Sequence, residues 1–126
     1  MKFKRIAVIY RGHLRTWNYV KNVNFSSFEK ISRKVDYYFV TWNLPYDHDA
    51  VQNDFKNKNL IKYLKIDVDK KYYNFDIGSR WLGYNIAPFK TQQENDFSYD
   101  AVFDLRPDIL FLINNKNKLI TLEENT

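Results

Sequence analysis

Short continuous apolar runs alternate with amphipathic stretches along this chain, and the alternation limits its fold more than any other feature. The first run, Ile6–Tyr10, is rich in β-branched residues, as is typical of a strand buried on both faces of a parallel sheet. Further strands are expected at 36–42, 63–68 and 100–103, apolar runs at 109–113 and 119–122, and helices near 16–31, 50–58 and 79–90. Strands that alternate with helices predict an α/β fold with a Rossmann-like, mostly parallel sheet and helices on both faces.

The first helical stretch carries two signals of an internal break. The region Asn22–Asn24 is expected to interrupt it, and Ser26 followed by Glu29 has the spacing of a capping box that begins a second helix. The strand at 63–68 alternates apolar and polar residues, which predicts a half-exposed strand near a sheet edge. Pro88 is expected to kink the third helix or to mark its break.

Length and composition fit a single folded unit. With 126 residues, 44% hydrophobic and 18% aromatic, the chain can bury one core. We expect one α/β domain over 1–122 and a loose tail at 123–126. The chain has no cysteine, which excludes disulfides and cysteine-based zinc sites. No apolar run approaches the roughly 20 residues that span a bilayer, and the run at 6–10 is too short for a signal-peptide core. We therefore expect a cytoplasmic protein.

Positive charge is concentrated in the first part of the chain. The formal net charge is +5, but residues 1–34 hold nine Lys or Arg and one acidic residue, whereas the rest carries a net charge of −3. A basic region of this kind attracts phosphate groups, and both nucleotides and nucleic acids carry them. The alternative is a solvated basic surface with no partner.

A basic segment follows the first strand. It reads Arg11-Gly12-His13-Leu14-Arg15, and it precedes the expected start of a helix. Guanidinium groups donate hydrogen bonds to phosphate in pairs, and a helix N-terminus adds backbone donors. The spacing matches neither a Walker loop nor a G-x-G-x-x-G fingerprint. The alternative is a loop of solvated arginines in which Gly12 is needed only for its backbone angles.

A second polar segment follows the strand at 100–103. Asp104, Arg106 and Asp108 are held around Pro107, which fixes the backbone. Two carboxylates near a strand end can hold Mg²⁺ or Mn²⁺, while the arginine can reach a phosphate. The alternative is a structural turn in which Arg106 neutralises both acids. In an open parallel sheet, ligands bind beyond the carboxyl ends of strands where strand order reverses, so we expect the two segments to face each other there.

The end of the second strand offers weaker candidates. Thr41 and Trp42 lie there, and Trp42 is either one wall of a nucleoside pocket or a core residue, the latter being slightly favoured. The types of residue in Tyr46–Asp49 include metal ligands, but a solvated loop is the better interpretation. With no cysteine, two histidines and no G-x-S-x-G or H-E-x-x-H motif, the chain has no nucleophilic triad or zinc-protease motif.

Three collinear segments carry a resemblance to known proteins. Ile6–Trp17 runs from a strand into Gly-His-Leu-Arg-Thr, Phe39–Asn43 contains a strand ending in Thr-Trp, and Tyr99–Ile109 contains a Tyr-Asp strand ending in Arg-x-Asp. Together they resemble a loosely defined group of glycosyltransferase-like proteins of bacteria, phages and giant viruses. The resemblance implies a GT-A-type nucleotide-sugar-binding fold, in which Arg106-Pro107-Asp108 takes the place of the Asp-x-Asp motif that binds metal and diphosphate.

The chain departs from that group in two ways. Arg106 stands where the first Asp of the motif would be, so a built-in cation can partly replace a metal ion. GT-A enzymes continue well past this motif, and the chain resembles their donor-binding half alone. We therefore expect either a homo-oligomer that completes its site by self-association or a protein that binds a nucleotide sugar without turning it over.

Our leading hypothesis is a minimal glycosyltransferase-like protein that transfers sugar from a nucleoside diphosphate sugar to an unidentified hydroxyl acceptor. In it, Asp108 and Asp104 hold Mn²⁺ or Mg²⁺, three arginines complement the diphosphate and His13 donates to a phosphate; the arginines are Arg11, Arg15 and Arg106. No residue is nominated as catalytic base. The alternative is a non-catalytic basic module for nucleic acid or nucleotide. Nucleic acid is the weaker choice, because the bases are not interleaved with aromatic residues and the two aspartates repel a phosphate backbone.

Overall fold

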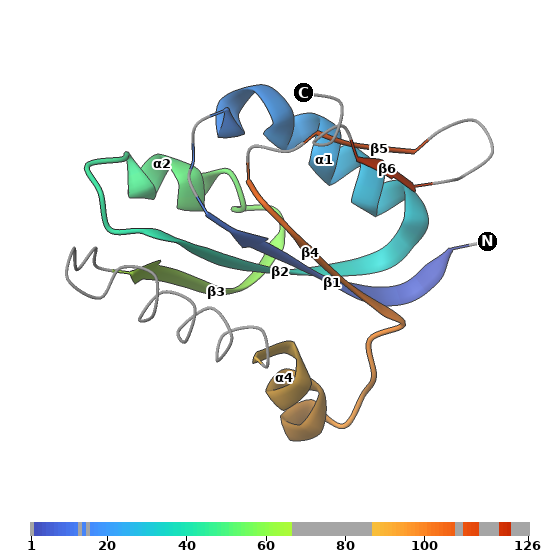
Figure 1. Cartoon of the computed structure of the whole chain (residues 1–126). Helices are drawn as coiled ribbons and strands as arrows, with labels where there is room; N and C mark the ends of the chain where they lie inside the picture. The colour runs from blue at the N-terminus through green and yellow to red at the C-terminus, as the bar shows by residue number, and fades with distance from the viewer. Residues whose placement is uncertain are drawn as a thin grey trace.

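The chain forms a four-stranded parallel sheet flanked by helices (Figure 1). A computed structural model describes residues 2–12, 14, 16–66, 87–107, 110–113 and 119–121. The strands stand in the order β3-β2-β1-β4; their bounds are Phe3–Arg11 for β1, Ser32–Trp42 for β2, Asn59–Ile66 for β3 and Ala101–Leu105 for β4. The predicted α/β fold with a Rossmann-like parallel sheet is confirmed.

Helices cover both faces of this sheet. α1 (Trp17–Ile31) and α2 (His48–Asn53) lie on one face, and α4 (Ala87–Asn95) lies on the other (Figure 1). A separate antiparallel pair, β5 (Phe111–Ile113) and β6 (Leu119–Thr121), lies beside α1. None of the helices within the described ranges is both long and apolar enough to cross a membrane.

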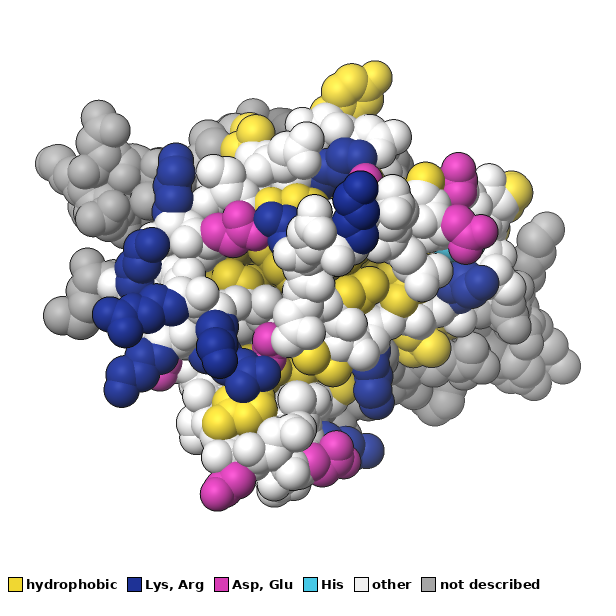
Figure 2. All heavy atoms as spheres, turned by 180° about the vertical axis from the view of Figure 1, so that it is seen from behind, with side chains coloured by type: hydrophobic (Ala, Val, Ile, Leu, Met, Phe, Trp, Pro, Cys, Tyr) yellow, Lys and Arg dark blue, Asp and Glu magenta, His cyan; other side chains and the backbone are white. Residues whose placement is uncertain are grey.

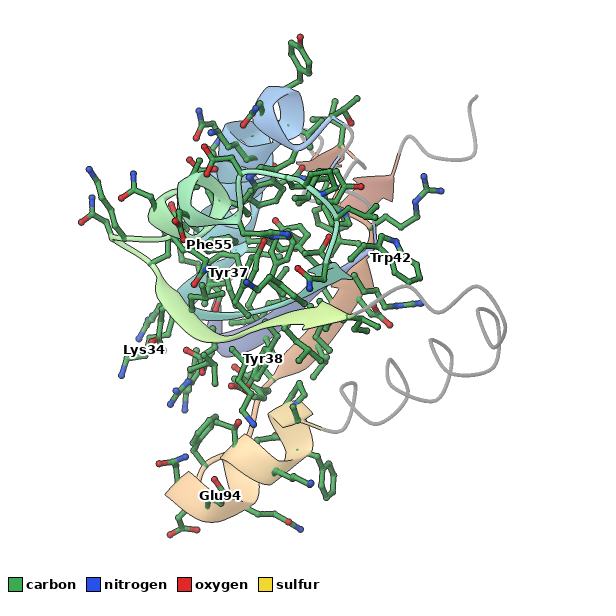
Figure 3. The ribbon with its side chains drawn as sticks, turned by 90° about the vertical axis from the view of Figure 1, so that its left-hand side faces the viewer. Lys34, Tyr37, Tyr38, Trp42, Phe55 and Glu94 are labelled. Atoms are coloured by element: carbon green, nitrogen blue, oxygen red, sulfur yellow. The ribbon has the colours of Figure 1, made fainter. Side chains whose placement is uncertain are left out.

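The core has one layer on each face of the sheet because side chains alternate along the strands. Tyr37 packs with Phe55 on the side of α1 and α2, whereas Tyr38 faces α4 (Figure 3). The first layer is mostly aromatic, with Trp17 stacked on Phe55 at a ring-centroid distance of 5.6 Å. Ile6–Tyr10 is at most 1% exposed, as expected for a strand buried on both faces.

The expected break in the first helix is wrong, since α1 is continuous. Asn24 is fully buried, and its Oδ1 accepts the backbone N–H of Phe111 at 2.7 Å. Ser27 donates to the carbonyl of the same residue at 2.8 Å. The expected capping box is also wrong, because Ser26 and Glu29 both lie inside the helix. Asn24, which resembles a helix break in the sequence, instead holds β5 together with Ser27.

Other boundaries differ by a few residues. α2 begins at His48 rather than 50, because Asp47 caps it by accepting the backbone N–H of Ala50 at 3.0 Å. β3 begins at Asn59, four residues before the expected start, and forms a sheet edge as predicted. Pro88 lies in the first turn of α4, where its missing N–H costs no hydrogen bond. Residues 67–86, which include the expected start of this helix, and the expected tail at 123–126 lie outside the described residues.

Candidate functional site

The two polar segments meet at the carboxyl ends of β1 and β4. Both strands pair in parallel with Tyr10 opposite Leu105, so Gly12 and Arg106 follow side by side. β4 lies on one side of β1, while β2 and β3 lie on the other, so strand order reverses between β1 and β4. This is the position at which open α/β sheets bind ligands.

Gly12 sits between the neighbouring strands. Its φ is +128°, a backbone conformation that side chains disfavour. A Cβ at this position would lie 3.6 Å from Pro107 Cδ and 3.8 Å from Arg106 Cγ, which is ordinary contact. On the other side, its N–H donates to the carbonyl of Val40 at 3.0 Å, and its own carbonyl accepts from Thr41 Oγ1 at 2.8 Å. Glycine is therefore favoured at this position because φ is positive, and not because a side chain would lack space.

An ion pair joins the same two strands. Arg11 Nε donates to Asp104 Oδ1 at 2.7 Å, and the side chains are 38% and 32% exposed. Asp104 therefore already has a cationic partner, and any divalent metal would share this carboxylate with the guanidinium. In the part of the chain that the structure describes, no group of three or more His, Asp or Glu side chains could hold a metal ion.

The structure describes three of the remaining predicted site residues, while the other three lie outside the described ranges. Arg106 is exposed beside Gly12, whereas His13, Arg15 and Asp108 lie outside the described residues. Thr41 is fully buried and holds the loop after β1 through its hydroxyl. Trp42 is 3% exposed and belongs to the core on the α4 side, the placement favoured from sequence. Thr41 thus stabilises the loop of the candidate site from within the core.

A hollow of about 250 Å³ opens beside the loop after β1. It is lined by residues from the loop after β1, from α1, from the loop after β2 and from α2, namely Leu14, Trp17, Asn18, Tyr46, Asp47, Ala50 and Val51. Sequence reasoning missed this hollow. The only sequence signal for it was the position of Leu14 and Tyr46 after the ends of two neighbouring strands.

The histidine of the Tyr46–Asp49 loop is held by protein groups. His48 Nδ1 lies 2.8 Å from the hydroxyl of Tyr63, and Nε2 lies 3.1 Å from the carbonyl of Leu44. Burial raises the pKa of Tyr63, so its hydroxyl remains protonated in this contact. Both ring nitrogens face hydrogen-bonding groups of the protein, as in a structural histidine.

No protein-family model, curated protein or solved structure matches this chain. The class is therefore defined by the fold and the site themselves. It is an α/β protein whose parallel sheet brings two arginine-bearing segments together at the reversal of strand order.

Proposed function

We propose that this chain is a glycosyltransferase-like protein that binds the diphosphate of a nucleoside diphosphate sugar at the carboxyl ends of β1 and β4. One observation carries the proposal: β1 pairs with β4 in parallel register, with Tyr10 opposite Leu105, at the reversal of strand order. This pairing brings together two segments that are more than ninety residues apart in sequence and that both contain arginine. Paired guanidinium groups suit the adjacent phosphates of a diphosphate.

The residues at this end of the sheet have complementary parts in the proposed reaction. Arg106, with Arg11 and Arg15, would balance the negative charge that develops on the departing diphosphate, and His13 would donate to a phosphate oxygen. The acceptor hydroxyl oxygen would form a bond to the anomeric carbon of the sugar as the bond from that carbon to the diphosphate oxygen breaks, and the hydroxyl proton would pass to the departing diphosphate or to solvent. Stabilisation of the negative charge on the departing diphosphate is the largest contribution that such a cationic site can make to the reaction.

The nucleoside would occupy the hollow next to the loop after β1. Leu14 and Val51 give it an apolar surface, while Asn18 and Asp47 supply polar atoms at its rim. Its volume of about 250 Å³ is on the scale of a nucleobase rather than of a whole nucleotide sugar. The diphosphate and sugar would then extend from the hollow toward Arg106.

A divalent ion has a defined place in this proposal. Asp108 together with Asp104 would hold Mn²⁺ or Mg²⁺, which would add positive charge at the diphosphate. Asp104 fits this use only in part, because Arg11 already binds its Oδ1. We therefore propose that the arginines supply most of the charge and that the metal adds to it.

Thermal unfolding with UDP-sugars and GDP-sugars, with and without Mn²⁺, tests the binding step. Binding to the folded state raises the unfolding temperature, and about 2.7 kcal/mol is gained at a hundredfold excess over Kd. We expect Arg106→Ala to lose the shift and Lys62→Ala, an exposed residue of β3, to keep it. The absence of a shift with every nucleotide would refute the proposal. Release of nucleoside diphosphate with a hydroxyl acceptor would then show whether bound sugar is transferred.

A further inference from the structure

The fold separates the basic first part of the chain into two groups. Arg11 stands at the carboxyl end of β1, beside the proposed diphosphate site. Lys2 and Lys4 lie at the other end of that strand, and the β1–β2 register places Phe3 beside Ser32 and Arg5 beside Lys34. Figure 2 shows lysine and arginine side chains gathered on the flank where the chain begins. These amino-end bases therefore do not share a surface with Asp104.

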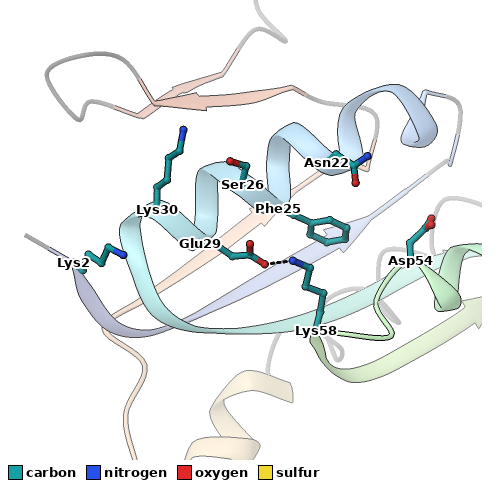
Figure 4. A pocket seen from close by; sticks show the side chains of 8 residues that line it. All are labelled: Lys2, Asn22, Phe25, Ser26, Glu29, Lys30, Asp54 and Lys58. Carbon is teal, nitrogen blue, oxygen red and sulfur yellow. Dashed lines mark hydrogen bonds and ion pairs between the residues drawn. The ribbon is translucent and has the colours of Figure 1, made fainter.

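A polar groove runs along α1 at this amino end. Its first hollow, of about 430 Å³, lies between one face of α1 and the turn after α2 (Figure 4). The α1 face repeats every three or four residues, at Asn22, Phe25, Ser26, Glu29 and Lys30. A second hollow, of about 260 Å³, shares Glu29 and Lys58 with the first and extends past the start of β2. The two hollows therefore adjoin at the Glu29–Lys58 pair, and we refer to both together as the groove.

The charges inside this groove divide into paired and unpaired sets. Glu29 is paired with Lys58 across the groove (Figure 4), and Asp54 is paired with Lys21 at 2.9 Å. Both acids of the lining are therefore neutralised by the protein. By contrast, three exposed lining bases enter no ion pair with any described residue: Lys2, Lys30 and Arg33. The groove consequently presents an excess of positive charge.

A buried tyrosine also contributes to the lining of the groove. Tyr37 is 1% exposed and lines the second hollow, yet its hydroxyl has no hydrogen-bond partner among the described residues. Burial, and to a smaller extent the Glu29 carboxylate, raises the pKa of Tyr37, so the hydroxyl stays protonated and can donate. A buried donor without a partner costs free energy, which a ligand oxygen would recover if its entry into the second hollow exposed the hydroxyl.

We propose that this groove binds single-stranded nucleic acid, with the phosphate backbone along Lys2, Lys30 and Arg33. The two adjoining hollows and the spread of the bases over them fit several phosphates in a row rather than one. Amide and hydroxyl groups of Asn22 and Ser26 line the groove and can hydrogen-bond base edges. A membrane surface fits less well, because the large exposed apolar side chains are scattered over β1, α1, β3, α4 and β4. The repulsion expected from Asp104 does not apply, since that residue stands at the opposite end of the sheet.

Fluorescence anisotropy of the full chain with a fluorescein-labelled single-stranded DNA of mixed sequence tests this proposal. Three phosphate contacts predict a slope of about −2 in a plot of log affinity against log salt concentration. Between about 50 mM and about 200 mM salt, the affinity should therefore fall about 20-fold. No binding at low salt would overturn the proposal, and so would binding to phosphatidylserine vesicles without binding to DNA.

Two pairs of neutralising substitutions with the same change in net charge locate the site. Lys30→Gln with Arg33→Gln should weaken binding at least about tenfold and reduce the salt slope by about 1.4. Lys62→Gln with Lys90→Gln, exposed on the β3 edge and on α4, should leave affinity within about threefold. An equal loss of DNA affinity in the two double variants would indicate that DNA responds to net charge alone. That outcome would overturn the proposal that the groove is the binding site. Any thermal shift with nucleotide sugars should persist in the first pair, which keeps this test separate from the proposed function.

Removal of one oxygen atom tests the groove without changing charge. Tyr37→Phe keeps the ring in the core and removes only the hydroxyl. It should weaken DNA binding several-fold with an unchanged salt slope, since no phosphate cation is lost. Binding equal to that of the unsubstituted chain would place the strand outside the second hollow and overturn the proposed path.

Discussion

Arg11 at the end of β1 donates from Nε to Oδ1 of Asp104 in β4 at 2.7 Å. The pair spans the two strands between which strand order reverses, so it lies at the proposed ligand site. An ion pair at a ligand site competes with the ligand for both of its side chains. A phosphate would compete with Asp104 for Arg11, and a metal ion would compete with Arg11 for Asp104.

Asp104→Asn is expected to weaken the competition of this side chain with the diphosphate for Arg11, since an amide oxygen accepts from a guanidinium less strongly than a carboxylate does. The thermal shift with a nucleotide sugar should then increase without metal, and any additional shift from Mn²⁺ should be lost. Stability without ligand should change by less than about 1 kcal/mol, because both partners are about a third exposed. Glu94→Gln on α4 is the matched control and should behave like the unsubstituted chain. A Mn²⁺-dependent shift that survives in Asp104→Asn would remove this carboxylate from the metal site.

Gly12→Ala is expected to cost about 1–3 kcal/mol of unfolding free energy, measured by urea denaturation. The cost comes from the backbone, since φ is +128° while the added Cβ would meet only ordinary contacts near Pro107. The loop after β1 should shift as it relieves this strain, and nucleotide-sugar binding should weaken. Stability like that of the unsubstituted chain would mean that the loop can adopt another conformation freely.

Asp36→Ala is expected to be the most damaging of these single changes. Asp36 is 2% exposed, and its carboxylate accepts from Arg5 at 2.7 Å, from Asn59 Nδ2 at 2.6 Å and from the Tyr99 hydroxyl at 2.7 Å. Its removal leaves three donors without their acceptor, at a cost of about 3–5 kcal/mol. Glu94→Ala, an exposed acid on α4, should cost less than about 0.5 kcal/mol. Equal urea midpoints for the two variants would contradict this assignment.

Asn24→Ala tests the contact between α1 and β5. The change leaves the buried N–H of Phe111 without its 2.7 Å acceptor and is expected to cost about 1–3 kcal/mol. Asn22→Ala on the exposed side of the same helix should be neutral or slightly stabilising, because alanine is the better helix former. Urea denaturation of both variants gives the comparison. A similar effect at both positions would show that helix propensity, rather than this contact, dominates.

Stability is expected to fall in alkaline solution. Burial is the largest cause that raises the pKa values of Tyr10 and Tyr37 above the ordinary value of 10.0. Above about pH 10 the unfolded chain loses these protons while the folded chain keeps them, so the unfolded state is favoured as pH rises. Each tyrosine contributes up to about 1.4 kcal/mol per pH unit in this range. Urea denaturation at several alkaline pH values measures the slope, and Tyr37→Phe should reduce it; equal slopes in the two proteins would contradict the role of Tyr37.

The local pattern of apolar and polar residues was sufficient to predict the parallel sheet and the position of the candidate site at its edge. The uninterrupted apolar run Ile6–Tyr10 indicated a strand buried on both faces, since no polar side chain there required solvent. Alternation with helices implied parallel strands, and parallel strands have their carboxyl ends at one edge. The meeting of Gly12 with Arg106 followed from these two steps.

The local sequence pattern gave a wrong prediction where a polar side chain bonds to a residue that is distant in sequence. Asn24 was interpreted as a helix break because asparagine favours turns, yet its partner is the backbone of Phe111, 87 residues away. The amino-end groove was equally hidden, because one of its walls is a face of α1 and the other is the turn around Lys58.

The sequence by itself determined the strands, their parallel direction and the edge where polar segments gather, because these depend on side-chain periodicity and short connections. Only the tertiary structure decided which charges cancel. Arg11 and Arg33 are indistinguishable as basic residues in one region of sequence. In the folded chain the first is paired with Asp104, whereas the second is exposed and enters no ion pair with a described residue. The physical reason is that ion pairing requires approach within a few ångströms, and strand register and helix packing set those distances.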